Sequence, residues 1–145
     1  MADVRVVAVA GGFDPLHPGH ISHLREARKL GTRLVVILNP DQDLIRKKGM
    51  VFMPYEARKS ILEELRCVDQ VIMAIDGDGT VAQTLRELRP HIFAKGGDRV
   101  PGNMPANEIA VCQEIGCEVI FGVGGSKEYS STELIRSAIR RAVSK

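Results

Sequence analysis

The sequence GGFDPLHPGH, residues 11–20, joins a predicted strand to a predicted helix and decides how the chain can fold. Residues 4–10 before it are apolar and rich in β-branched side chains, which is typical of a buried strand. Apolar residues recur at helical spacing after it, from Ile21 to Leu30, and Gly31 marks the end of that helix. In an open α/β sheet such a turn lies at the carboxyl end of a strand, where ligands bind. The free N–H groups and positive dipole of the helix start favour phosphate there.

The remainder of the chain alternates between strand and helix patterns. Further strands are expected at residues 34–38, 68–75, 91–95 and 118–123, and helices at 54–65, 81–88, 107–115 and from Ser130 or Ser131 onward. The strand runs are continuously apolar, as in strands covered on both faces. Residues 43–50 are expected to form a basic, mobile loop, residues 100–105 another loop, and Thr80 the cap of helix 81–88. The pattern predicts an α/β fold, a Rossmann-like doubly wound five-stranded parallel sheet, as a single domain over residues 1–145.

Composition narrows the class of protein. The chain has 145 residues, of which 44% are apolar and 26% charged, as in an ordinary globular domain. A net charge of +2 and an aromatic content of 4% argue against a nucleic-acid partner. No apolar run approaches the roughly 20 residues of a membrane span, and no signal-peptide pattern is present. Cys67, Cys112 and Cys117 lack C-x-x-C spacing, which predicts reduced, packed thiols in a cytoplasmic protein without a membrane partner.

The histidines of the opening stretch have an alternative interpretation as a metal pair. Zinc sites need three or four ligands, and the cysteine nearest in sequence to His17 and His20 is Cys67, in another predicted helix. We therefore expect no metal site made by the protein. The glycines of the same stretch lack the G-x-G-x-x-G spacing, and the pattern G-x-x-x-x-G-K-[ST] is absent from the chain. Hydride transfer and phosphate-loop hydrolysis are both disfavoured, and handling of phosphate groups is the better interpretation.

Other polar residues follow the ends of other predicted strands. Lys47 and Lys48 come after the second strand, Asp98 follows Gly-Gly after the fourth, and a serine-rich helix start carries Thr132 and Arg136 after the fifth. Each has an ordinary alternative: a solvated loop for the lysines, a turn for the aspartate and a helix cap for the serines. Their convergence at the carboxyl ends of parallel strands favours one shared binding site.

Two of these stretches resemble the signatures of a known family. Residues 11–20 resemble the G-x-F-D-x-x-H-x-G-H signature of the cytidylyltransferase-like nucleotidyltransferase superfamily, and residues 130–136, SSTELIR, resemble its S-S-T-x-x-x-R signature. Because the two agree in order and separation, the resemblance covers essentially the whole chain. It implies transfer of a nucleotidyl group from a nucleoside triphosphate to a small phosphorylated acceptor, by in-line attack and with release of pyrophosphate. Mg²⁺ is implied as the counterion of the triphosphate.

The resemblance also implies a role for each matching residue. His17 and His20 would stabilise the α-phosphate in the transition state and the leaving pyrophosphate, and Lys47 or Lys48 would neutralise the acceptor phosphate. Arg58 would lie near the acceptor, although a pairing with Glu63 or Glu64 on its own helix is the ordinary alternative. Nucleotide contacts are implied for Gly12, Phe13, Asp14, Gly19, Gly97, Asp98, Ser131, Thr132 and Arg136.

The acceptor and the base stay open at this point. Residues 95–98, KGGD, are similar to a stretch of the heptose-1-phosphate adenylyltransferases. Glycerol-3-phosphate cytidylyltransferases share the layout but end in R-T-E-G-I-S-T-T, and here Gly125 stands in the place of that arginine. We therefore expect ATP or CTP as donor and a sugar phosphate or polyol phosphate as acceptor. An FMN adenylyltransferase of the FAD synthetase kind and a non-catalytic nucleotide sensor are the alternatives. The resemblance also admits a homodimer, because dimers are common among the relatives.

Overall fold

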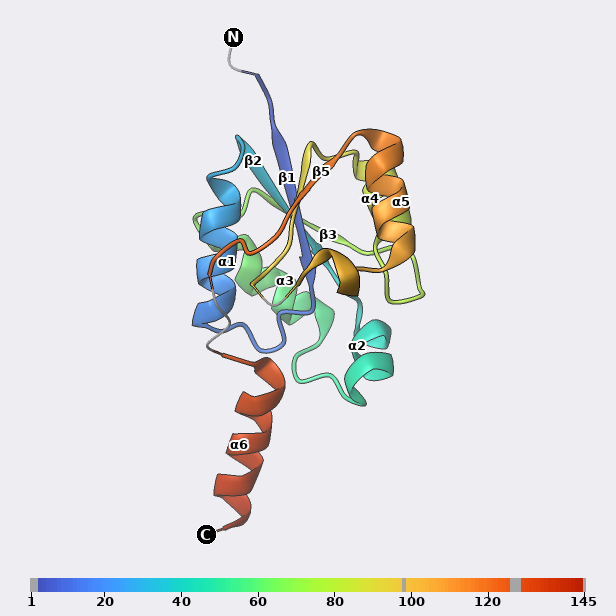
Figure 1. Cartoon of the computed structure of the whole chain (residues 1–145). Coiled ribbons are helices and arrows are strands. Elements are labelled where there is room, and N and C mark those ends of the chain that lie inside the picture. Colours follow the sequence, from blue (N-terminus) through green and yellow to red (C-terminus); the bar gives the residue numbers. More distant parts are fainter. Residues whose placement is uncertain (1–2, 98, 126–128, 145) are drawn as a thin grey trace.

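A computed structural model describes residues 3–97, 99–125 and 129–144 and has a parallel sheet between two layers of helices (Figure 1). Its strands are β1 (Val6–Gly11), β2 (Arg33–Leu38), β3 (Gln70–Met73), β4 (Ile92–Ala94) and β5 (Glu118–Ile120). Its helices are α1 (Pro18–Arg28), α2 (Asp41–Lys48), α3 (Tyr55–Glu63), α4 (Ala82–Leu88), α5 (Ala106–Ile115) and α6 (Ser131–Val143). The five strands lie in the order β3-β2-β1-β4-β5, and all pairings are parallel. The doubly wound fold predicted from the sequence is confirmed, with its switch point between β1 and β4.

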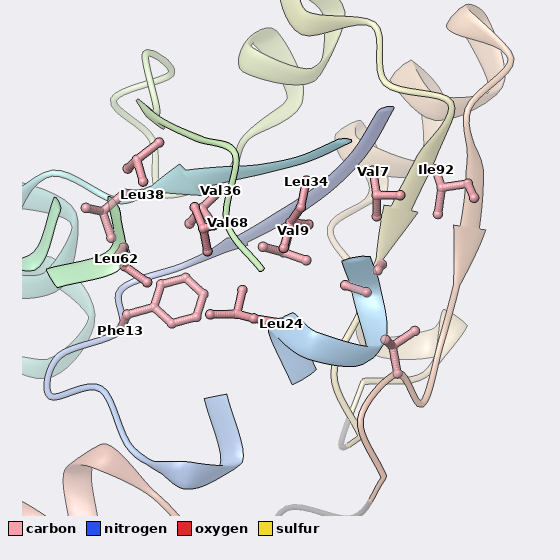
Figure 2. Packing of buried hydrophobic residues seen from close by; sticks show 14 of the residues in the cluster. Val7, Val9, Phe13, Leu24, Leu34, Val36, Leu38, Leu62, Val68 and Ile92 are labelled. Atoms are coloured by element: carbon pink, nitrogen blue, oxygen red, sulfur yellow. The ribbon is translucent and has the colours of Figure 1, made fainter. Parts of the chain in front are cut away.

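Each face of the sheet has its own apolar core. On one face α1 and α3 pack against side chains of β1 and β2, as Figure 2 shows for Leu24, Leu62, Val7 and Val9. On the other face α4 and α5 cover the alternate residues of the same strands; this core includes Ala8, Ile37, Ala82, Leu85, Phe93, Val111 and Cys112. Successive residues of a strand therefore serve different cores, and this is why the strands read as continuous apolar runs.

Residues 43–50, predicted as a loop, are mostly helix α2. Aspartates occupy its first turn and Arg46, Lys47 and Lys48 its last, which is the arrangement that the helix dipole favours. Gly49 ends the helix in the left-handed conformation, with φ of 81°. The loop prediction was wrong because α2 has a short apolar face and depends on charge placement. The two lysines are consequently held on a regular element rather than on a loose segment.

Smaller differences concern where elements begin. Helix α4 begins after Val81 without a side-chain cap, so Thr80 is not its cap. The Thr80 hydroxyl instead donates to Asp78 at 2.7 Å and accepts from Asn107 at 2.9 Å. Pro101–Asn103, inside the predicted second loop, forms one short 3-10 turn.

All three cysteines are free thiols, as predicted. Within the described parts of the chain, no helix has the length and apolarity needed to cross a membrane.

Helix α6 extends away from the sheet and its covering helices (Figure 1). Along α6, which is described throughout, Ser131 alone is buried. The large apolar side chains of α6 are mostly in solvent, with Leu134 36%, Ile139 55% and Val143 78% exposed. Only the start of α6 therefore belongs to the packed body of the fold.

Candidate active site

A cavity of about 330 Å³ opens where the segments following β1, β2, β4 and β5 meet. Parallel strands present their carboxyl ends at one edge of the sheet, so residues distant in sequence come together there. Residues predicted to act in the site supply much of the lining, namely Gly12, Phe13, His17, Gly19, His20, Lys47, Lys48, Gly97 and Ser131. Asp14, Arg58, Thr132 and Arg136 are not part of that lining, and Asp98 lies outside the described residues. The volume suits a nucleotide-sized ligand.

His17 and His20 cap helix α1 with their own side chains. His17 is the N-cap, and its Nδ1 accepts from the backbone N–H of His20 at 3.3 Å. His20 Nδ1 in turn accepts from the backbone N–H of His17 at 3.2 Å, which completes a reciprocal capping box. An Nδ1 that accepts a backbone N–H carries no proton, so each neutral imidazole has its proton on Nε2. Helix capping thus sets the tautomer that can donate a hydrogen bond to a phosphate oxygen.

Aromatic packing fixes the planes of the two imidazoles. Their ring centroids are 3.6 Å apart and the rings are stacked, with Phe13 meeting the His20 ring edge-on at 4.8 Å. Phe13 adopts a positive φ of 48°, an uncommon conformation for a residue with a side chain, and its ring is buried in the core. Gly19 lies so close to the His17 ring that an added Cβ would be 3.0 Å from Cε1. The turn therefore holds the two rings at a defined place, at the positive end of the α1 dipole.

Asp14 has a role in holding the turn together. Its carboxylate is buried and accepts backbone N–H groups from Phe52 at 2.6 Å and Met53 at 2.7 Å. These bonds connect the turn after β1 to the segment between α2 and α3. Since each oxygen accepts one backbone N–H, we assign Asp14 to holding the turn, and the nucleotide contact implied for it stays a prediction.

Arg58 likewise does not line the cavity; it holds together the segments that form the cavity wall. Its guanidinium is fully buried and donates to the carbonyl oxygens of Met53 at 2.8 Å, Gly12 at 3.0 Å and Asn39 at 2.8 Å. The remaining nitrogen meets the Asp41 carboxylate at 2.6 Å. These acceptors belong to the ends of β1 and β2 and to the starts of α2 and α3. The expectations that Arg58 contacts the acceptor or pairs with Glu63 or Glu64 were both wrong, because its donors are engaged across the sheet edge.

The start of α6 meets the first turn of the site. Ser130 is the N-cap, accepting from the Glu133 N–H at 3.3 Å, and the Ser131 hydroxyl donates to the Pro15 carbonyl at 2.8 Å. Thr132 is half-buried, whereas Arg136 is exposed on the part of α6 that leaves the body. The structure therefore brings Ser131 to the cavity and leaves the Arg136 side chain outside its lining.

Three cavity residues were missed by the sequence interpretation: His23, Lys95 and Arg99. The His23 Nδ1–H donates to the Val123 carbonyl at 2.8 Å, and burial lowers the pKa of its imidazole, an effect that the carbonyl contact opposes. Gly124 lies against the α1 backbone, where an added Cβ would be 2.5 Å from the His23 Cα, so the loop after β5 needs glycine there. The position of Lys95 immediately after a buried strand was the available signal, since polar residues there face the site.

Comparison with known proteins agrees with this geometry. The family model described as "Cytidylyltransferase-like" matches residues 8–138. Among curated proteins, the bifunctional protein HldE of Haemophilus ducreyi is 40% identical over 124 residues, covering 84% of this chain and 24% of the relative. The bifunctional protein HldE of Pelobacter propionicus is 35% identical over 139 residues, covering 94% of this chain and 28% of the relative. The chain thus spans about a quarter of the length of these relatives.

Solved structures show the same fold. A lipopolysaccharide core biosynthesis protein from Thermoplasma volcanium superposes with a TM-score of 0.68 at 29% identity, covering 88% of this chain and 100% of that one. Thermotoga maritima TmcAL superposes with a TM-score of 0.63 at 16% identity, covering 95% of this chain and 50% of that one. At that lower identity the second similarity concerns the fold alone.

Proposed function

The chain belongs to the cytidylyltransferase-like family of nucleotidyltransferases, and from this premise we propose that it transfers a nucleoside monophosphate from ATP or CTP to a small phosphorylated acceptor. An oxygen of the acceptor phosphate attacks the α-phosphorus of the triphosphate. The bond from the α-phosphorus to the bridging oxygen of the β-phosphate breaks, and pyrophosphate leaves. Such a transfer needs little covalent help from the protein, so positioning and charge stabilisation carry the catalysis.

The observation that carries this proposal is the pair of stacked imidazoles that cap α1 with their Nδ1 atoms. The Nε2–H groups of His17 and His20 are the donors we assign to the α-phosphate oxygens and the leaving pyrophosphate. The N-terminus of α1 adds a positive partial charge at the same place. Fixed donors that face developing negative charge commonly supply several kcal/mol of transition-state stabilisation.

Lys47 and Lys48 lie at the last turn of α2 and supply positive charge to another part of the cavity lining. We assign to one of them the neutralisation of the acceptor phosphate, which lets two anionic reactants approach. Magnesium enters with the triphosphate as part of the substrate. A sugar phosphate or polyol phosphate is the acceptor class we propose, because the KGGD stretch resembles the heptose-phosphate enzymes and one structural relative is named for lipopolysaccharide core biosynthesis.

A pyrophosphate-release assay over the four common nucleoside triphosphates and a panel of acceptor phosphates tests the proposal. We expect release with ATP or CTP and a sugar phosphate or polyol phosphate, with little release from either substrate alone. Release that requires FMN as acceptor would instead assign an FMN adenylyltransferase. Tight triphosphate binding without pyrophosphate from any pair would contradict catalysis and favour a nucleotide sensor.

Arg136 provides a test of the triphosphate site itself. We propose that Arg136, on the first turns of α6, pairs with the β- and γ-phosphates when the nucleotide binds. Arg136→Ala is then expected to raise the dissociation constant of the preferred triphosphate about 10-fold, the usual effect of losing one charge-assisted hydrogen bond. Isothermal titration calorimetry measures this directly.

Arg140→Ala is the matched control for Arg136→Ala. Arg140 lies one turn further along α6, and its guanidinium pairs with Glu133 at 2.7 Å on the exposed surface. We expect its triphosphate affinity to stay within twofold of the wild-type value. Equal affinities for the two variants would remove Arg136 from the triphosphate site.

A further inference from the structure

Lys95 places a mostly buried cation at the carboxyl end of β4. It follows β4, which pairs with β1, and its backbone is fixed on both sides: its N–H donates to Ile120 at 2.8 Å and its carbonyl accepts from Val123 at 3.0 Å. The side chain lines the cavity, is only 11% exposed, and holds its ammonium 4.5 Å from the centre of the Phe93 ring. A cation in such a position is expensive to desolvate and needs negative charge close by.

Glu108 of α5 is the carboxylate that faces Lys95, and the two are not hydrogen-bonded. Glu108 Oε2 accepts from the Val81 N–H at 3.0 Å, while Oε1 lies 3.8 Å from the Lys95 ammonium. Among the described residues, Oε1 has no hydrogen-bond partner although it is buried. A buried pair at this separation stabilises the charge of Lys95 without using the hydrogen-bonding capacity of the ammonium. Glu108 therefore orients a cation that makes no hydrogen bond to the described residues and whose donors face a ligand in the cavity.

Further positive charge surrounds this ammonium. Lys47 of α2 and Arg99 also line the cavity, and the field of each lowers the pKa of Lys95, as burial does most strongly. Glu108 opposes these effects and raises the pKa of Lys95, and Cys112 acts in the same direction. The charge of Lys95 in turn lowers the pKa of His23. Among the described residues, the three cations Lys47, Lys95 and Arg99 line this part of the cavity and Glu108 is the one carboxylate that acts on Lys95, so the charge there is positive. A phosphate monoester dianion would compensate that excess charge.

The position of these cations relative to His17 and His20 indicates which substrate group they face. Phe93, over which Lys95 packs, belongs to the core beneath α4 and α5, whereas Phe13, which meets the His20 ring, belongs to the core beneath α1 and α3. The cavity therefore has imidazoles on the α1 side of the sheet edge and cations on the α5 side. In-line displacement places the attacking and leaving groups on opposite sides of the phosphorus.

We infer that Lys95, positioned by Glu108, binds the phosphate of the acceptor, so that the acceptor site is a cradle of Lys47, Lys95 and Arg99. This inference rests on the proposed function, with the leaving pyrophosphate on the histidine side. It makes the phosphate of the acceptor a requirement for recognition, since an uncharged acceptor would leave the cations unpaired. Lys95 is then a substrate-binding residue and Glu108 a positioning residue.

The test uses inorganic phosphate as a probe of this cradle. Phosphate is titrated calorimetrically into protein already saturated with an α,β-methylene analogue of ATP or CTP, which occupies the histidine side. Lys95→Met is expected to weaken phosphate binding at least 10-fold and to change the affinity of the analogue less than twofold. Lys59→Met is the matched control: Lys59 faces Glu63 on the surface of α3, and both affinities should be unchanged. The double variant Lys95→Met/Glu108→Gln removes both charges together and is titrated in place of Lys95→Met if that single variant is unstable.

Glu108→Gln tests the positioning role through pH. Glutamine keeps an acceptor for the Val81 N–H but removes the charge that raises the pKa of Lys95, so Lys95 should lose its proton at lower pH. The alkaline limb of the phosphate affinity should therefore move to lower pH in Glu108→Gln. A merely structural role of Glu108 would leave the position of that limb unchanged.

Two results would overturn the inference. Unchanged phosphate affinity in Lys95→Met would remove Lys95 from the acceptor site, and an equal loss of analogue affinity would assign Lys95 to the nucleotide instead. Failure of the proposed function gives a different result, because the wild-type protein would then release no pyrophosphate from any pair of substrates. Phosphate titrations of the analogue-free wild-type and Lys95→Met proteins still decide the role of Lys95 in that case.

Discussion

Replacing His17 by asparagine is expected to lower kcat about 100- to 1,000-fold, the usual cost of removing one preorganised donor from a site of charge development. The stability of the fold should change by no more than about 1 kcal/mol, because asparagine is itself a good N-cap and can accept the His20 N–H as His17 does now. His20→Gln is the companion variant, since glutamine at this position of a capping box can reach back to the backbone N–H of residue 17. Pyrophosphate release and urea denaturation measure the two effects separately.

His91→Asn provides the control for these histidine substitutions. Its Nδ1 accepts from the Val6 N–H at 2.9 Å, so it also serves the backbone through a ring nitrogen, but it is not among the residues that line the cavity. We expect its kcat to match that of the wild type. Turnover within threefold of the wild-type value in both His17→Asn and His20→Gln would show that the pair only caps the helix.

Arg58→Met is expected to lower the free energy of unfolding by about 3–5 kcal/mol, the range for breaking a buried, fully hydrogen-bonded charge. This loss arises because three backbone carbonyls would lose their donor, and each acceptor left unsatisfied in the interior costs about 1–3 kcal/mol. Because domains are stable by only about 5–15 kcal/mol, the change should be plain in a urea denaturation curve.

Comparison with neighbouring variants separates structural support from substrate binding. Lys59→Met, one residue away on the exposed side of α3, should change the free energy of unfolding by less than about 0.5 kcal/mol. Arg58→Lys keeps the charge but cannot form the same forked contacts, so an intermediate loss is expected. If Arg58→Met is as stable as the wild type but binds acceptor poorly, the structural assignment of Arg58 is wrong.

The fold could be predicted because its determinants are local. The strand before residues 11–20, the helix after them and the later alternation each follow from apolar periodicity within a short window. The position of the cavity could be predicted as well, since parallel strands present their carboxyl ends together. Helix α2 was missed because it has little apolar periodicity and places opposite charges at its two ends.

The inner support of the site could not be predicted, because it depends on partners far apart in sequence. Asp14 accepts from backbone groups 38 and 39 residues away, and Arg58 donates to a carbonyl 46 residues away. No pattern in the sequence indicates which polar side chain will bond to the backbone and which will face a ligand. Lys95 did have a local signal in its position after a buried strand, but its pairing with Glu108 could not be predicted, because Glu108 comes from a helix that follows later in the chain.

The outward course of α6 has a consequence for amide hydrogen exchange. Isolated helices shorter than about 12–15 residues are marginal in water, and α6 has 13 residues with only Ser131 buried. Its amides are therefore expected to exchange far faster than those of β1 and β2, which lie in the centre of the sheet and should open only with global unfolding. If a bound triphosphate engages Ser131 and Arg136, it stabilises the helical turns between them. Mass spectrometry should then find slower exchange in the first half of α6 when nucleotide is present, and unchanged exchange in β1 and β2.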